Sequence, residues 1–185
     1  MATYLFMDCE MGGSELKYSL LAAYFSITDD KFNIIDNLYL QVKPDDGVYI
    51  VSGQGMQINK INLAIHDDVA IPYKKAKPLL YDFLKRNSNG IPCLIPVGHG
   101  VKRDISHITD KLISDKTWEQ FCTYHYIDTS VFLQILPLQG KIPNHIDGSV
   151  SKLANLFDIR VEGEDHDCRI DTLKNMKIFQ RMLSL

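Results

Sequence analysis

The sequence predicts a single mixed α/β domain in which antiparallel strands come first and helices then alternate with strands. Three observations favour this class. The first 42 residues hold three apolar segments, rich in β-branched and aromatic residues, with short connections between them. From residue 72 onward, apolar residues recur at helical spacing between short buried runs. The length of 185 residues suits one domain with an ordinary core, so we expect residues 1–185 to form a single unit.

The N-terminal part predicts an antiparallel meander. The predicted strands cover residues 3–9, 17–27 and 32–42. The turn sequence "TDD" separates the second from the third, as in a hairpin. Residues 44–71 contain several glycines and predict loops, with a short helix near 59–65. From Pro72 the sequence "IPYKKAKPLLYDFLKRN" has helical spacing, and Pro78 predicts an irregularity within that helix.

The C-terminal part adds two more strands, which makes five. Strands are predicted at 93–100 and 121–129, and helices at 101–113, 130–136, 148–157 and 167–184. Each of the longer helices carries one apolar stripe, and in the last one Ile170, Leu173 and Met176 begin that stripe. We therefore expect a mixed five-stranded sheet flanked by helices.

Charge and cysteine content limit the possible partners and locations. The net charge is −3, so nucleic-acid binding must depend on a local patch or on bound cations. The four cysteines are widely spaced without a CxxC pair, which predicts reduced core residues and no zinc cluster. We find no signal peptide and no apolar run of ~18 residues, so we expect a cytoplasmic protein without a membrane partner.

The first strand ends in an unusual acidic pair, in "YLFMDCEMGG". Because side chains alternate along a strand, Asp8 and Glu10 project to the same face and repel each other. The pair either belongs to the solvated rim of the strand or holds a cation.

Two later segments carry further acids in positions typical of functional sites. In "VGHGVKRDI" a buried strand ends at Gly98, and Asp104 follows in the first turns of the next helix. Loops at strand ends are where sites form in α/β sheets, although an exposed helix residue is the alternative. In "GEDHDCRID", His166 and Asp171 lie at the start of the last helix, where a solvated acidic helix terminus is the alternative.

Taken in order, these three segments resemble the DEDD superfamily of 3′→5′ exonucleases, in the histidine-containing (DEDDh) subgroup of the RNase T, oligoribonuclease and proofreading type. "FMDCEMGG" matches its acidic pair, "GHGVKRD" its Gly-His-x-x-x-x-Asp turn, and "HDCRID" its His-x-Ala-x-x-Asp motif. Three positions depart from the pattern: Cys168 replaces alanine, Gly100 an asparagine that is frequent there, and Arg103 an aromatic residue. The resemblance runs from residue 4 to about residue 180 and implies an RNase H-like fold.

The resemblance also implies a reaction, which is hydrolysis of the terminal phosphodiester to release nucleoside 5′-monophosphates. Two divalent cations, Mg²⁺ or Mn²⁺, about 3.5–4 Å apart, activate the attacking water and stabilise the leaving oxygen. By the resemblance Asp8 bridges both ions, Glu10 and Asp171 hold one, and Asp104 holds the other, largely through water. His166 is then the general base.

The same comparison suggests residues that contact a single-stranded 3′ end. Met11 and Gly12 follow the first motif, where backbone amides could receive the terminal hydroxyl and Met11 could pack against a base. Lys102 and Arg103 flank the acid of the second motif and could contact phosphates. The alternatives are a core methionine for Met11 and a solvated helix face for the two cations. Several relatives are dimers, so a homodimer is also expected by analogy.

Two other functions stay open at this point. One is a nucleic-acid-binding module that retains the fold with weak or no catalysis. The other is a phosphohydrolase that acts on small nucleotides. DNA and RNA are not distinguished, because recognition of the 2′-hydroxyl depends on the shape of the pocket.

Overall fold

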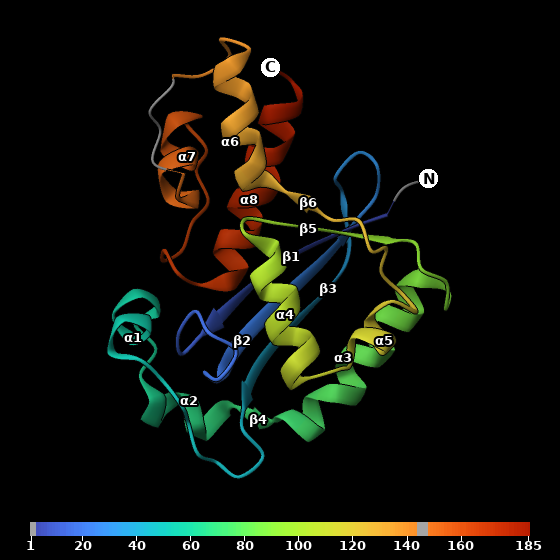
Figure 1. Ribbon diagram of the computed structural model, residues 1–185, viewed down its shortest axis with the longest axis vertical. Helices are drawn as coiled ribbons and strands as arrows, with labels where there is room; N and C mark the ends of the chain where they lie inside the picture. The colour runs from blue at the N-terminus through green and yellow to red at the C-terminus, as the bar shows by residue number, and fades with distance from the viewer. Residues whose placement is uncertain (1–2, 144–147) are drawn as a thin grey trace.

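A six-stranded mixed sheet forms the centre of the protein, in a computed structural model that describes residues 3–143 and 148–185 (Figure 1). The strand order is β4-β3-β2-β1-β5-β6. The strands are β1 (Thr3–Met11), β2 (Leu20–Thr28), β3 (Ile34–Lys43), β4 (Ile71–Pro72), β5 (Leu94–Gly98) and β6 (Ile127–Asp128). β1, β2 and β3 pair antiparallel, whereas β5 pairs parallel with β1 and β6 parallel with β5. The predicted mixed sheet with antiparallel first strands is therefore confirmed.

The edges of the sheet differ in detail from the prediction of five strands. β4 adds a sixth strand, with two residues that pair parallel with β3 at one edge. The strand predicted at 121–129 is reduced to the two residues of β6, preceded by an isolated bridge between Cys122 and Leu94. Between them Thr123 Oγ1 donates to the carbonyl of His125, which turns the chain away from the sheet. Periodicity does not identify such short pairings, because two residues carry no period.

Helices cover both faces of the sheet (Figure 1). One face packs against α3 (Tyr73–Ser88), α4 (Val101–Lys111) and α5 (Asp115–Trp118). The other packs against α8 (Cys168–Leu183), which in turn packs with α6 (Thr129–Leu138) and α7 (Val150–Leu156). Two short helices, α1 (Gly53–Asn59) and α2 (Leu63–Val69), replace the single one expected near 59–65. Lys60 separates them in a left-handed conformation, with φ 57°.

Because side chains alternate along β1, the strand presents different residues to the two faces of the sheet. Leu5, Met7 and Cys9 are buried against the face that carries α3 and α4. Phe6 points to the opposite face and packs against Phe179 of α8, with ring centroids 5.9 Å apart. Asp8 and Glu10 continue along that face, so the helix that buries Phe6 also brings its first turn over the end of β1.

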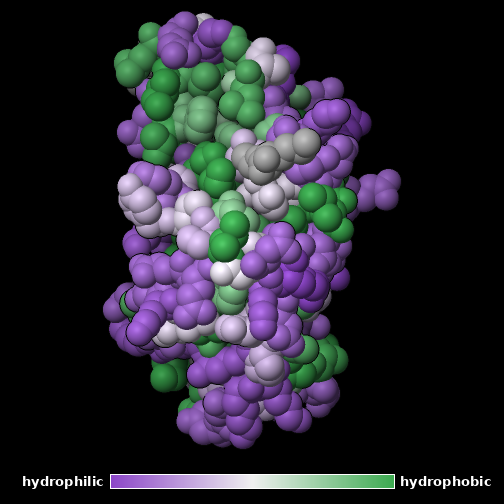
Figure 2. Space-filling model, turned by 90° about the vertical axis from the view of Figure 1, so that its right-hand side faces the viewer, coloured by the Kyte–Doolittle hydropathy of each residue, from purple (hydrophilic) through white to green (hydrophobic). Residues whose placement is uncertain are grey.

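The surface is mostly polar, with one apolar region on α6. Figure 2 shows hydrophobic side chains gathered in the upper part of the face, at the height of α6 and the C-terminal end of α8. On α6, Val131, Ile135 and Leu138 are exposed. Within the described ranges, no helix has the length and the apolar character needed to cross a bilayer. The four cysteines are free thiols, as expected.

Candidate active site

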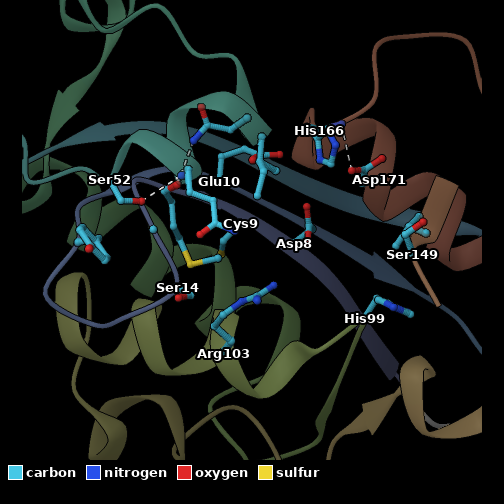
Figure 3. Close-up of a pocket in the computed structure, with 18 of the residues that line it drawn as sticks. Asp8, Cys9, Glu10, Ser14, Ser52, His99, Arg103, Ser149, His166 and Asp171 are labelled. Carbon is cyan, nitrogen blue, oxygen red and sulfur yellow. Dashed lines mark hydrogen bonds between the residues drawn. The ribbon is translucent and has the colours of Figure 1, made fainter. Parts of the chain in front are cut away.

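Three carboxylates from the two ends of the chain meet in one place. Asp8 and Glu10 lie at the end of β1, and Asp171 lies in the first turn of α8. One oxygen from each of the three side chains lies within 4.8 Å of the others. In Figure 3, Asp8 lies between Glu10 on one side and Asp171 with His166 on the other. The strand pattern thus provides two of the acids, and the packing of α8 on Phe6 brings the third to them.

Asp104 is a fourth acid, buried in the first turn of α4. Only 1% of its surface is exposed, and neither carboxylate oxygen has a hydrogen-bond partner within the described part of the chain. The burial of Asp104 and the nearby Asp8 carboxylate raise its pKa well above the ordinary value. The structure therefore does not support the alternative that Asp104 is an exposed helix residue. Its oxygens are not part of the group within 4.8 Å, so coordination through water stays a prediction.

The acids destabilise one another's charged forms. Burial, followed by the charges of neighbouring carboxylates, raises the pKa of Asp8 to about 7 and that of Glu10 to about 9. Burial also raises the pKa of Asp171, although Lys174 opposes this effect. Such a group is stable in its ionised form only when a cation neutralises it. An all-oxygen donor set, with unpartnered buried oxygens on Asp104, fits a hard divalent cation such as Mg²⁺ or Mn²⁺.

His166 lies at the mouth of the site, on the short loop that precedes α8. Its backbone is left-handed, with φ 65°, which is uncommon for a residue other than glycine. The His166 N–H donates to Asp171 Oδ2 at 3.2 Å, and both residues line the same cavity. The third segment therefore presents an imidazole and a carboxylate together, as its spacing suggested.

Buried hydrogen bonds join the Gly-His turn of the second segment to α6 and α8. Gly100 N–H donates to Asp128 Oδ1 at 2.9 Å, and His99 Nδ1 lies 3.1 Å from Thr129 Oγ1. The Thr129 hydroxyl is also 2.7 Å from Asn175 Oδ1 on α8. Gly100 has φ 73°, a left-handed position that glycine adopts without strain and that asparagine tolerates better than most residues. These contacts hold the turn before Asp104 against the helix that carries Asp171.

A cavity of about 540 Å³ opens over the acids, and two of the four predicted substrate-binding residues line it. Met11 and Arg103 belong to its wall, and Figure 3 shows Arg103 directed toward Asp8 and Cys9. Lys102 is exposed and does not line the cavity.

Gly12 does not have the position that we expected. Its N–H donates to the Ser19 carbonyl at 2.8 Å, so this amide is not free to receive a terminal hydroxyl. A Cβ atom at Gly12 would lie 2.7 Å from Val51 Cγ1 and 2.8 Å from the Ile50 carbonyl. A glycine is therefore needed here for close packing against residues 50–51. The contact with substrate that we expected does not explain it.

The wall opposite α4 comes from α1, which the sequence did not assign to the site. Ser52 caps α1 by accepting the Gly55 N–H at 3.0 Å, and its hydroxyl also donates to the Gly12 carbonyl at 3.0 Å. Asn59 Nδ2 donates to the Met11 carbonyl at 2.9 Å. The only sequence signals were a serine before a short helix and a glycine three residues later.

Comparisons with known proteins show which solved structures share this fold. No family model and no curated protein match the sequence. The fold matches a structure of exonuclease I with a TM-score of 0.79 at 16% identity, covering 100% of this chain and 41% of that one. A structure of E. coli exonuclease I in complex with a dT13 oligonucleotide matches with a TM-score of 0.77 at 16% identity, covering 99% and 41%. Cell-death related nuclease 4 (CRN-4) matches at 0.74 and 15%, covering 100% and 64%. One further exonuclease I structure is the zinc ion bound form of a complex with single-stranded DNA.

These likenesses define a class of fold. The chain has the RNase H-like fold of these exonucleases, at an identity too low to transfer an activity by itself. It spans about two fifths of the exonuclease I chains. The function must therefore be argued from the site.

Proposed function

We propose that this protein is a metal-dependent 3′→5′ exonuclease of the DEDDh type, which hydrolyses the terminal phosphodiester of single-stranded nucleic acid. The observation that carries the proposal is the meeting of Asp8, Glu10 and Asp171 within 4.8 Å, together with a buried Asp104 without a hydrogen-bond partner among the described residues. A self-repelling group of acids that is held together by the packing of the fold is costly unless it binds cations. The solved structures that share this fold include exonuclease I and a cell-death related nuclease.

The four acids divide into two sets by position. Asp8 lies between Glu10 and Asp171 in Figure 3 and would be the bridge between two cations. Glu10 and Asp171 would complete one site, and Asp104 of α4 would hold the second through water. Divalent cations there supply a Lewis acid and a water of lowered pKa, which an isolated phosphodiester lacks.

His166 is the residue that we assign to proton transfer. Its side chain lines the cavity beside Asp171 and is accessible to a water molecule there. An imidazole near neutral pH can accept a proton from an attacking water, and no other histidine on this loop competes for the role. Arg103, at the wall of the cavity, is placed to pair with a phosphate oxygen of the substrate.

The substrate is proposed to be the 3′ end of a single strand. The acids lie inside a cavity, so an end can reach them more easily than the middle of a duplex. Met11 is half-buried in the wall and offers an apolar contact for a terminal base. A homodimer remains a prediction from the resemblance alone.

The test is digestion of a 5′-labelled DNA oligonucleotide and its RNA counterpart with Mn²⁺ or Mg²⁺. We expect a ladder of successively shorter labelled products, and no ladder when EDTA is present. Asp8→Asn should lower the rate by at least about 10³-fold, since it removes more than about 4 kcal/mol of transition-state stabilisation. The matched control is Asp110→Asn, because Asp110 is an exposed acid on α4 away from the cavity.

Each other outcome identifies one of the alternatives. Binding of the oligonucleotide without any shortening would favour the binding module. Hydrolysis of nucleoside triphosphates or small diesters, with oligonucleotides left intact, would favour the small-nucleotide phosphohydrolase. Activity that survives Asp8→Asn would refute the assignment of the site.

A further inference from the structure

A buried lysine lies one helical turn beyond the acid of α8. Only 6% of the surface of Lys174 is exposed, although lysine is among the residues least often buried. A buried ammonium group is costly unless it is paired with an opposite charge, so its contacts indicate why it is retained. The resemblance to the exonucleases assigned no role to this position.

Lys174 contacts one residue on each side of His166, which are Asp165 in the preceding loop and Asp171 in α8. Its Nζ donates a hydrogen bond to Oδ1 of Asp165, the residue directly before His166. The same Nζ lies 3.5 Å from Asp171 Oδ1. The other oxygen of Asp171 accepts the His166 N–H. Lys174, Asp165, His166 and Asp171 therefore form a closed set of contacts that fastens the loop to the first turn of α8.

Two other contacts involve this loop: Asp165 also has a side-chain hydrogen bond with Ser151, and Gly163 packs closely against Ile170 of α8. Residues 162–166 are exposed, so burial does not hold the imidazole in place. The left-handed backbone of His166 has an intrinsic cost, commonly about 1–3 kcal/mol for a residue in a sparsely populated region. Such a conformation persists only when surrounding contacts impose it. Here Asp171 accepts the His166 N–H, and Lys174 donates to Asp165, the residue before it.

We propose that Lys174 is a positioning residue, which holds the His166 loop in its reactive conformation through Asp165 and Asp171. This inference rests on the proposed function, in which His166 accepts the proton of the attacking water. Lys174 also supplies a fixed positive charge 3.5 Å from Asp171 Oδ1. It acts through its neighbours and does not itself touch the substrate.

Another lysine of the same helix offers a matched comparison. Lys177 lies one turn further along α8, is exposed, and donates to the Arg160 carbonyl at 3.1 Å. It carries the same charge, but its hydrogen bond goes to Arg160, and among the described residues no hydrogen bond or ion pair joins it to the acids or to residues 163–166. Lys177→Met therefore measures the effect of removing a positive charge from α8 without releasing the loop.

The kinetic test compares Lys174→Met with Asp165→Asn, the double variant and Lys177→Met, at saturating Mn²⁺. We expect Lys174→Met to lower kcat by about 10-fold or more while KM changes by less than about 2-fold, because the loss of position affects the chemical step. Asp165→Asn, a change at a side chain that is half exposed, should fold normally and lower kcat in the same direction. The double variant should be no worse than the poorer single variant.

Two further measurements separate positioning from a general loss of stability. In a His166→Ala background, Lys174→Met should change the remaining rate by less than about 2-fold, since there is no imidazole left to position. Hydrogen exchange should show faster exchange of the amides at 163–167 in Lys174→Met, with the strands of the sheet unchanged. A loss of activity that persists without His166, or exchange in the loop equal to that of the wild type, would overturn the inference.

The exchange measurement needs no enzymatic activity, so the two proposals can fail separately. A wild-type protein that does not shorten oligonucleotides overturns the proposed function, while faster loop exchange in Lys174→Met still shows that the lysine holds the loop. An active wild type with an unchanged loop in Lys174→Met overturns only the role of Lys174. If Lys174→Met does not fold, Asp165→Asn decides the same question.

Discussion

A Cβ atom on Gly55 would lie 2.3 Å from the carbonyl oxygen of Gly12, so α1 and the end of β1 are in contact backbone to backbone. The same carbonyl accepts hydrogen bonds from both the N–H and the hydroxyl of Ser52, at 2.7 and 3.0 Å. This contact leaves no room for a side chain at position 55. It therefore holds in place the cavity wall that faces Glu10.

Replacing Gly55 by alanine should damage both the fold and the site. A methyl group would have to displace the Gly12 backbone, at a cost of about 1–3 kcal/mol in the free energy of unfolding. The matched control is Gly53→Ala in the same helix, where nothing lies within 4 Å of the added Cβ. That variant should be as stable as the wild type or slightly more stable, because alanine is the better helix former. Urea denaturation of both variants measures the difference, and equal stabilities would contradict the contact.

Divalent cations should stabilise the native protein. At about 100 times the dissociation constant, a bound ion adds about 2.7 kcal/mol, which corresponds to roughly 5–10 °C in Tm for a chain of this size. Asp8→Asn should lose most of this shift, since Asp8 lies between the other acids. Differential scanning calorimetry with and without millimolar Mg²⁺ or Mn²⁺ measures it. A Tm that does not move in the wild type would mean that the acids are not a cation site.

Without metal, the protein should become less stable as the pH rises from 7 to 8. The pKa of Glu10 in the folded protein is raised to about 9 and that of Asp8 to about 7, whereas the unfolded chain ionises both near pH 4. Stability from a raised carboxyl pKa is complete below the unfolded value and is lost as the pH approaches the folded value. In this interval the loss should be about 1–2 kcal/mol, because each proton linked to folding contributes about 1.4 kcal/mol per pH unit.

The interval from pH 7 to 8 is chosen to separate the effect of the acids on stability from that of other titrating groups. Burial lowers the pKa values of His66, His107 and the half-buried His99 in the folded protein, and above pH 7 these groups are mostly neutral in the unfolded chain as well, so they contribute less to the change than the acids do. Glu10→Gln should flatten the dependence, and so should saturating Mg²⁺, which holds the carboxylates in their charged form. Denaturation curves at the two pH values provide the measurement. Stability that rises with pH in the metal-free wild type would show that the acids do not repel each other as described.

Two adjacent cations of α4 should differ in their effect on substrate binding. Arg103 lines the cavity, whereas Lys102 is exposed outside it. We expect Arg103→Ala to raise KM for an oligonucleotide by about 10-fold, as the loss of one charge-assisted contact implies, and Lys102→Ala to change it by less than about 2-fold. Steady-state kinetics on a single oligonucleotide compares them. Equal effects would indicate a general electrostatic contribution and no specific contact from Arg103.

Local patterns in the sequence were sufficient for the main elements and for the acids. Side chains of any strand point alternately to its two faces, so the common direction of Asp8 and Glu10 followed from a period of two. The first turn of α8 was equally accessible, because His166 and Asp171 lie within a few residues of each other. Prediction was poorest where the structure depends on contacts between distant segments. The two-residue β4 pairs with β3, and α1 packs against Gly12 through Gly55.

The sequence alone determined which residues could hold cations, since acid type and strand or helix period are properties of short segments. Only the tertiary structure decided that the three segments converge, that Asp104 is buried without a partner in the described chain, and that Lys174 faces the acids. The physical reason is that burial and charge pairing depend on which distant surfaces pack together. The packing of α8 against Phe6 establishes those contacts, and no window of the sequence contains both partners.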